Sequence, residues 1–252
     1  MSRRSNTNPF RPLVAALIAA TLAATFALPA LAGASSGGAS LGSAGAPPGG
    51  SSAQPGNLTV TVSGGGFTLS ARISVLLHHE LRFFGQGPSS SAGKTIVIQR
   101  LDPQAGWVDA TRALAAGDGS FSALWRSNLA GRFQIRLAIA PTRSSSAHAA
   151  SDLPTLQVTV YRPAIATIFG EGFFGQQTAC GKTLRRQTLG VANRTLPCGT
   201  KVAIYYRAHT IVVPVIDRGP YANGADWDLT EATANALGMR ETDTIGAARV
   251  SS

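Results

Sequence analysis

Three carboxylates surround one short turn near the C-terminal end of the chain. In VVPVIDRGPYANGADWDLT, residues 212–230, an apolar run ends on Asp217, an RGP turn follows, and Asp226 and Asp228 come shortly afterwards. This cluster needs an explanation because the chain has only 12 acidic residues against 22 basic ones. Grouped carboxylates can act as general acid and base, but aspartates also stabilise turns and cap helices. We expect Asp226 to be a solvated loop acid.

The other two aspartates each have a chemical and a structural interpretation. Asp217 stands before the Gly219–Pro220 corner, where glycine permits the turn and proline fixes its own φ, so we expect this carboxylate to face a groove and take part in chemistry. Asp228 precedes a helix-like segment. We expect it to be the N-cap, with Glu231 three residues on and Gly238 as the C-terminal stop. Such a cap could also face the groove.

The composition favours short strands over long helices as the elements that position these acids. The 252 residues include 28 Gly and 14 Pro, and a hydrophobic content of 44% is enough for a core. From 57 to 161, short apolar runs alternate with turn residues, which predicts an antiparallel β-sandwich. The pattern GW…DGSF…W…GRFQIR within it resembles the immunoglobulin-like modules of exported bacterial proteins.

The N-terminal segment has the pattern of a secretory signal peptide, which we assign to residues 1–32. A positive region is followed by the uncharged apolar stretch 13–28 and by Ala-Leu-Ala at 30–32, a small-x-small cleavage pattern. The alternative is an uncleaved membrane anchor. With cleavage we expect a secreted or cell-envelope protein without stable membrane insertion. Residues 33–56 are rich in Gly, Ser, Ala and Pro and predict a flexible linker.

The charge balance bears on the partners of the protein. Cleavage after residue 32 would remove three arginines and no acid, which lowers the formal net charge from +10 to +7. A basic exported chain favours anionic wall polymers or lipid surfaces over nucleic acid, although a generic solubilising charge is the simpler interpretation. A metal site at His78-His79-Glu80 is not expected, because adjacent side chains of a strand point to opposite faces. We expect no metal and no cofactor.

The chain has two cysteines, Cys180 and Cys198, and we expect them to form a disulfide. Export permits the bond, and two cysteines have only one intramolecular way to pair. Closing the loop between them would stabilise the fold by about 3 kcal/mol. A cysteine nucleophile is disfavoured because the bond uses both thiols.

The last block resembles the RlpA-like double-psi β-barrel family. FGEGFFGQQTACG, VANRTLPCGTKV, VIDRGPY and WDLTEATANALGM occur in the order of that family's motifs. The resemblance implies a six-stranded barrel over 164–250 with interlocked psi loops, a groove and a short helix. The whole chain is then all-β, with an immunoglobulin-like β-sandwich followed by the double-psi barrel. Members of the family are associated with septal peptidoglycan, and some are lytic transglycosylases that cut glycan strands without water.

Lytic cleavage needs one group that protonates the leaving oxygen and then takes a proton from the sugar's own 6-hydroxyl. We assign this role to Asp217, with Asp228 as the neighbour that raises its pKa or binds sugar. The substrate would be peptidoglycan glycan strands. The side chains expected to bind them lie in the family motifs: Thr178, Lys182, Asn193, Tyr221 and Trp227. Tyr221, Trp227 and the Phe173–Phe174 pair are candidates for stacking on sugar rings.

Two positions depart from the family pattern. Lys182 stands where lytic members have Glu, and Asn193 stands where they have His. A nearby lysine lowers the pKa of an acid, and asparagine cannot titrate, although it can still form hydrogen bonds. Two hypotheses therefore stay open: an enzyme of the lytic transglycosylase type, and a non-catalytic glycan-binding module or wall-loosening module similar to the barrel domain of expansins.

Overall fold

The computed structural model describes residues 52–140, 152–221 and 224–250. The predicted signal peptide and residues 33–51 of the predicted linker lie outside this part of the chain. Within the described ranges, no helix has the length and the apolar composition that a membrane span requires.

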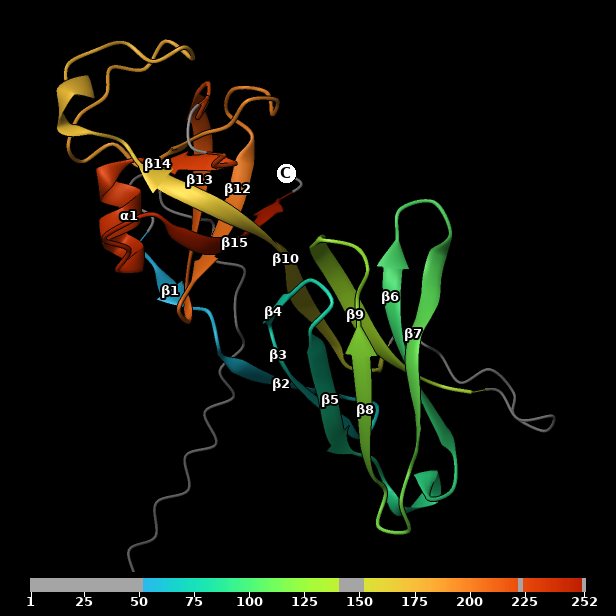
Figure 1. The fold of residues 1–252 in the computed structure, drawn as a ribbon. Helices are drawn as coiled ribbons and strands as arrows, with labels where there is room; N and C mark the ends of the chain where they lie inside the picture. The colour runs from blue at the N-terminus through green and yellow to red at the C-terminus, as the bar shows by residue number, and fades with distance from the viewer. Residues whose placement is uncertain (1–51, 141–151, 222–223, 251–252) are drawn as a thin grey trace, which may run out of the picture. The chain divides into compact units, whose positions relative to one another are not determined.

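Strands make up most of the regular secondary structure of the described residues (Figure 1). In chain order the strands are β1 (Gln54–Pro55), β2 (Thr59–Gly64), β3 (Phe67–Arg72), β4 (Ser74–Leu76), β5 (Glu80–Gln86), β6 (Thr95–Asp102), β7 (Gly106–Leu114), β8 (Ser120–Arg126), β9 (Gly131–Ile139), β10 (Thr155–Ile168), β11 (Val191–Ala192), β12 (Lys201–Tyr206), β13 (His209–Asp217), β14 (Trp227–Leu229) and β15 (Asp243–Arg249). The helical elements are α1 (Glu231–Leu237) and the 3-10 turns η1 (Ser89–Ser91) and η3 (Glu171–Phe173).

Six strands close into a barrel of mixed direction. Their order is β14-β11-β13-β12-β15-β10, and β10 pairs with β14 to complete the circle. The β10–β14 and β11–β13 pairs are parallel, while the other neighbours are antiparallel. The predicted six-stranded barrel is thus confirmed. Apolar side chains from these strands form its core, among them Val191, Val202, Ile204, Ile211, Val213, Val215, Leu229 and Ile245.

The N-cap of helix α1 lies two residues after the predicted one. Asp228 was expected to be the N-cap, but it lies inside β14, because this strand continues to Leu229 through its pairing with β10 and β11. The N-cap is Thr230, whose Oγ1 accepts a hydrogen bond from the Thr233 N–H at 3.3 Å. The predicted stop is confirmed, since Gly238 has a φ of 74°, in the left-handed region that favours glycine.

A long connection, residues 169–190, leads from β10 to β11, and we call it the first barrel loop. The predicted disulfide between Cys180 and Cys198 is confirmed, with a Cα–Cα distance of 5.7 Å, and it ties this loop to the turn before β12. Arg186 of the loop forms an ion pair with Glu231 of α1 at 3.4 Å. A small apolar cluster anchors the loop's ends; its buried members are Phe169, Leu184, Ala192 and Ile216. The loop is therefore attached to the barrel at several points.

The segment between β1 and the barrel consists of two sheets around a shared core. One sheet has the order β2-β3-β5-β8, and the other has the order β7-β6-β9-β10 with β4 beside β10. Buried side chains of both sheets form one cluster, which includes Leu69, Phe83, Ile98, Trp125, Leu137 and Val158. We call residues 57–161 the two-sheet region. Its assignment as immunoglobulin-like stays a prediction.

Strand β10 belongs to both the two-sheet region and the barrel. Residues 155–160 pair with β9, residues 162–166 pair with β15, and residues 166–168 pair with β14. The barrel also binds the end of the predicted linker, since Gln54–Pro55 pair with β13 and the Gly56 N–H donates to Ala208 O at 2.6 Å. The last linker residues are thus strand rather than free tether.

The corrected cap can be tested by replacing Thr230 with alanine. The side chain is only 1% exposed, and its hydroxyl also bonds Gly190 O at 3.1 Å, so Thr230→Ala removes a cap and a buried hydrogen bond. We expect the free energy of unfolding to fall by about 1–3 kcal/mol in denaturant titrations. Thr244→Ala, at an exposed position of β15, is the matched control and should change it by less than about 0.5 kcal/mol. Equal effects of the two variants would contradict the assignment.

Candidate active site

The barrel places both candidate acids in one row across its strands. Ala192 of β11 pairs with Asp217 of β13 on one side and with Asp228 of β14 on the other. Thr167 of β10 is the register partner of Asp228 on its far side. Because neighbouring strands lie about 4.8 Å apart, the α-carbons of the two aspartates are roughly 10 Å apart. Residues that are distant in sequence therefore meet at one site.

The environment of Asp228 favours the protonated form of its carboxyl group. It is half-buried, and the Thr167 hydroxyl donates a hydrogen bond to its Oδ1 at 2.9 Å. Burial raises the pKa of Asp228 above its ordinary value of 3.8 because it disfavours the charged form. The negative charge of Asp217 raises the pKa further, while the bond from Thr167 works against the shift. We had predicted the opposite relation, in which Asp228 would raise the pKa of Asp217.

Asp217 is bound to the backbone of the site. Its Oδ1 accepts hydrogen bonds from the N–H of Ala179 and from the N–H of Arg218, both at 2.8 Å. Ala179 precedes Cys180 in the first barrel loop, so this carboxylate joins the loop to the end of β13. The Arg218 guanidinium extends the contact, since it lies 3.3 Å from Cys198 Sγ. Asp217 thus has a structural function whatever its part in chemistry.

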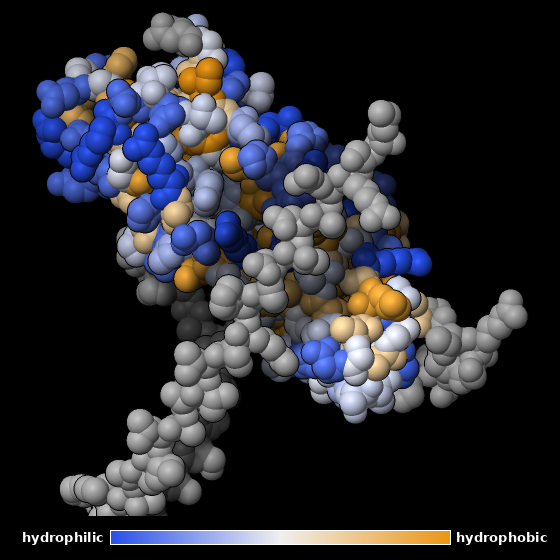
Figure 2. Space-filling model, turned by 60° about the horizontal axis from the view of Figure 1, so that its bottom comes forward, coloured by the Kyte–Doolittle hydropathy of each residue, from blue (hydrophilic) through white to orange (hydrophobic). Residues whose placement is uncertain are grey.

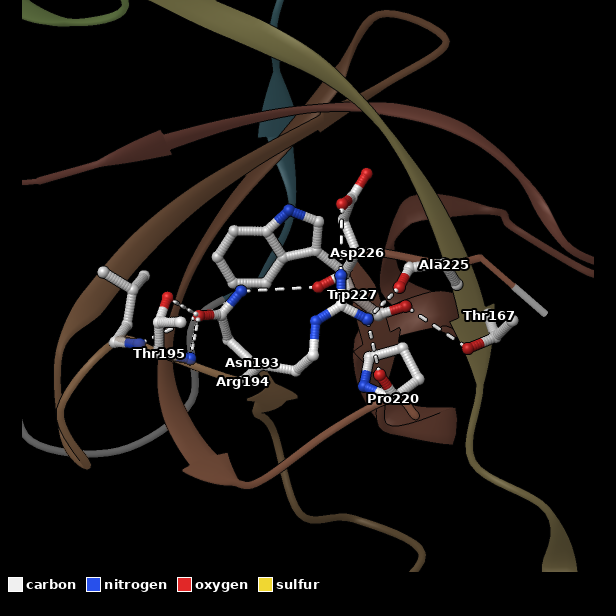
Figure 3. Close-up of polar contacts among 9 residues, drawn as sticks. Thr167, Asn193, Arg194, Thr195, Pro220, Ala225, Asp226 and Trp227 are labelled. Atoms are coloured by element: carbon white, nitrogen blue, oxygen red, sulfur yellow. Dashed lines mark hydrogen bonds and ion pairs between the residues drawn. The ribbon is translucent and has the colours of Figure 1, made fainter. Parts of the chain in front are cut away.

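Arg194 forms hydrogen bonds to two parts of the segment that joins Asp217 to Asp228 (Figure 3). Its Nη1 donates to the carbonyl oxygens of Pro220 at 2.7 Å and of Ala225 at 2.8 Å. Its Nη2 lies 3.5 Å from Asp226 Oδ1, so Asp226 is the partner of an ion pair rather than only a solvated acid. Neither carbonyl partner is marked by residue type, so the sequence alone does not indicate these contacts of Arg194.

Asn193 uses much of its amide within the chain (Figure 3). Its Oδ1 accepts from the N–H groups of Thr195 at 3.1 Å and Leu196 at 2.9 Å, and its Nδ2 donates to Asp226 O at 3.3 Å. These bonds shape the turn before Pro197. Only one hydrogen of the Asn193 amide is left for a ligand, so this side chain has few groups to offer a sugar.

Thr178 and Lys182 face each other across a tight turn of the first barrel loop. The Thr178 N–H donates to Lys182 O at 2.7 Å, and the Lys182 N–H donates to Thr178 Oγ1 at 3.1 Å. Thr178 is only 8% exposed, so its hydroxyl serves the turn. The Lys182 side chain is exposed, and Lys182 is not among the causes that shift the pKa of Asp228.

The aromatic residues divide into two groups. Trp227 is 8% exposed and packs in the barrel core, which leaves little of its ring for stacking on a sugar. Tyr221 is 79% exposed and Phe173 is 52% exposed, so both can contact a ligand. The Arg186 guanidinium lies over the Phe174 ring, 4.6 Å from the ring centre.

Hydrophilic residues are frequent on the surface of the barrel, as the blue areas at the upper left of Figure 2 show. The exposed basic side chains of the barrel region include Lys182, Arg185, Arg186, Arg194, Lys201, Arg207, Arg240 and Arg249.

Thr167 is the residue of this site that sequence reasoning missed. Its hydroxyl lies within hydrogen-bond distance of Asp228 Oδ1 and, at 3.2 Å, of Trp227 O. A hydroxyl in the run ATIFG gave no sign of this partnership, because the contact depends on the register of β10 against β14.

Residues 163–251 match the protein family described as lytic transglycolase. A "Probable endolytic peptidoglycan transglycosylase RlpA" of Synechocystis sp. is 39% identical over 77 residues, which are 30% of this chain and 24% of that protein. An "Endolytic peptidoglycan transglycosylase RlpA" of Campylobacter jejuni is 36% identical over 77 residues, or 30% of this chain and 28% of that protein. The chain thus spans about a quarter of the length of these relatives.

Among solved structures, the "Streptomyces papain inhibitor (SPI)" is 25% identical to this chain. The alignment covers 34% of this chain and 92% of the inhibitor, with a TM-score of 0.26, which is too low to support a structural conclusion. The family match and the RlpA relatives both fall on the closed six-stranded barrel. Residues 163–251 therefore form an RlpA-like double-psi β-barrel domain of the lytic transglycolase family.

Proposed function

We propose that the barrel cleaves peptidoglycan glycan strands by lytic transglycosylation, with Asp228 as the acid and base. The observation that carries the proposal is the position of this half-buried carboxyl in one row with Asp217 and Thr167, where burial raises its pKa. An acid catalyst must hold its proton at the start of the reaction, and burial beside a second carboxylate favours the protonated form. The family of the barrel and its RlpA relatives support the choice of substrate.

In the first step Asp228 donates its proton to the glycosidic oxygen, and the bond between that oxygen and the anomeric carbon breaks. The departing sugar leaves with a new hydroxyl. In the second step the Asp228 carboxylate takes the proton of the 6-hydroxyl on the sugar that keeps the anomeric carbon. The freed oxygen bonds to that carbon and closes a 1,6-anhydro ring. Asp228 is protonated again, and no water is consumed.

The neighbours of Asp228 assist both steps. The negative charge of Asp217 helps to keep the proton on Asp228 and stabilises the positive charge that develops at the anomeric carbon. The Thr167 hydroxyl has one hydrogen and two acceptors, Asp228 Oδ1 and Trp227 O. It can donate to Asp228 when the carboxylate forms, which stabilises the intermediate stage.

A glycan-binding or expansin-like wall-loosening module is the second candidate. Lys182 favours it, because it replaces the glutamate of lytic family members, and so does Asn193, whose amide is engaged in its own turn. Both candidates bind glycan, and only the first forms new chain ends. Digestion of purified peptidoglycan, followed by mass spectrometry for 1,6-anhydro-muramyl ends, separates them.

Export is part of this proposal, since peptidoglycan lies outside the cytoplasmic membrane. The support is the signal-peptide pattern of residues 1–32. We propose that residues 33–56 connect this segment to an immunoglobulin-like region, 57–161, and to the barrel, 164–250.

Asp228→Asn tests the assignment of the acid. Asparagine keeps the shape and can still accept the bond from Thr167, but it has no proton to deliver, so we expect the rate of anhydro-product release to fall about 10²-fold or more. Asp226→Asn is the matched control, because its side chain is 52% exposed, and it should keep most of the activity. Asp217→Asn should lower the rate less than Asp228→Asn. Full activity of Asp228→Asn together with loss in Asp217→Asn would return the acid role to Asp217.

The raised pKa of Asp228 also predicts a pH dependence of stability. Ionisation of this carboxyl is disfavoured in the folded state and therefore destabilises the fold. This destabilisation is absent below the ordinary pKa of 3.8 and is complete above the pKa of the folded state. Asp228→Asn lacks this destabilisation. We therefore expect the variant to gain stability relative to the native protein as the pH rises from about 3 to 7. Thermal unfolding at a series of pH values measures the difference, and a relative loss at neutral pH would contradict burial as the main cause.

A further inference from the structure

We propose a second glycan-contacting surface on the outer face of the sheet β7-β6-β9-β10. We call it the outer platform and define it by five side chains: Gln99, Trp107, Asp109, Arg112 and Arg136. The proposal rests on peptidoglycan as the substrate of the barrel and extends it to the two-sheet region. The ligand is a glycan strand with its peptide carboxylates.

The strand register places these side chains on one face. Ile98 of β6 and Leu137 of β9 are fully buried in the core, so the alternating neighbours Gln99 and Arg136 point outward. Gln99 pairs with Asp109 of β7 on one side and with Arg136 on the other. Arg136 pairs in turn with Thr155 of β10. The result is a polar row across four adjacent strands.

Hydrogen bonds fix this row before any ligand arrives. Arg112 Nη2 donates to Asp109 Oδ2 at 2.6 Å, Gln99 Nε2 donates to Asp109 Oδ1 at 2.9 Å, and Arg136 Nε donates to Gln99 Oε1 at 2.9 Å. The Arg136 guanidinium lies 4.3 Å from the ring centre of Trp107. Ordering a long side chain costs up to about 2 kcal/mol of rotamer entropy, so a ligand meets groups whose ordering is already complete.

The platform leaves donors for an anionic ligand. Within the described residues Arg136 uses Nε for Gln99, which leaves both Nη groups for a carboxylate. The same face carries Arg132, Arg112 and Arg136 against one acid, Asp109, so its charge is positive. A glycan strand with carboxylate-bearing peptides has the complementary charge.

Neutral groups on the same face match the rest of such a strand. Gln134 of β9 pairs with Gln157 of β10, and both side chains are exposed, so their amides can bond N-acetyl groups. The half-buried Trp107 ring offers an apolar surface to a sugar ring. Strand β10 contributes to this sheet and to the barrel site through Thr167. A polymer that binds at both places gains avidity of about 10²–10⁴ over either contact alone.

The test measures co-sedimentation of the full chain with insoluble peptidoglycan. We expect Trp107→Ala and Arg136→Gln each to weaken binding about tenfold. Phe84→Ala and Arg82→Gln are the matched controls, because both side chains are exposed on β5 of the other sheet, and they should bind like the native protein. Platform variants that bind as the controls do would overturn the proposal.

Two further measurements separate the possible failures. Cleavage of short soluble glycan fragments should be unchanged in Trp107→Ala, since such fragments reach only the barrel. If Asp228→Asn leaves cleavage intact while Trp107→Ala still weakens sedimentation, the proposed acid fails and the platform stands. Analytical ultracentrifugation tests whether the outer platform binds a second copy of the chain instead. A native dimer that Trp107→Ala converts to monomer would show such a contact and would overturn the glycan assignment.

Discussion

The register of strand β10 is the constraint on which the rest of the structure depends. This one strand of 14 residues pairs with β4, β9, β14 and β15, and among the strands of the described residues no other pairs with both the two-sheet region and the barrel. A shift of one residue would turn every side chain of β10 to the opposite face. Val158 would leave the core of the two-sheet region, and Thr167 would leave Asp228. Core packing and site geometry are thus fixed by the same hydrogen bonds.

The two aspartates illustrate how one fold gives different properties to the same side chain. Asp217 Oδ1 accepts hydrogen bonds from two backbone N–H groups and holds the first barrel loop. Asp228 is half-buried and accepts a hydrogen bond from the hydroxyl of Thr167. Burial raises the pKa of the Asp228 carboxyl, whereas the hydrogen bonds of Asp217 fix the position of the loop. The chemistry of the pair therefore follows from the position of each residue in its strand rather than from residue type.

Features that a motif or a residue count marks could be predicted from the sequence, whereas contacts that depend on strand register could not. The barrel, the Cys180–Cys198 bond and the stop at Gly238 follow from motif order, cysteine number and glycine conformation. The cap at Thr230 and the burial of Trp227 were missed, because both depend on how far β14 extends along its neighbours. The partners of Arg194 are backbone carbonyls, which no side-chain pattern reveals.

The path of the chain has a consequence for any attempt to dissect the molecule. The backbone touches the barrel at Gln54–Pro55, leaves it to build the two-sheet region, and returns along β10. The two-sheet region is in this sense an insertion between two segments of one sheet. A fragment that starts at residue 163 would lack the partner of His209 and Thr210 and would sever β10 within its run of pairs with β15. The boundary that homology draws at residue 163 is therefore not a boundary at which the polypeptide can be cut without exposing strand edges.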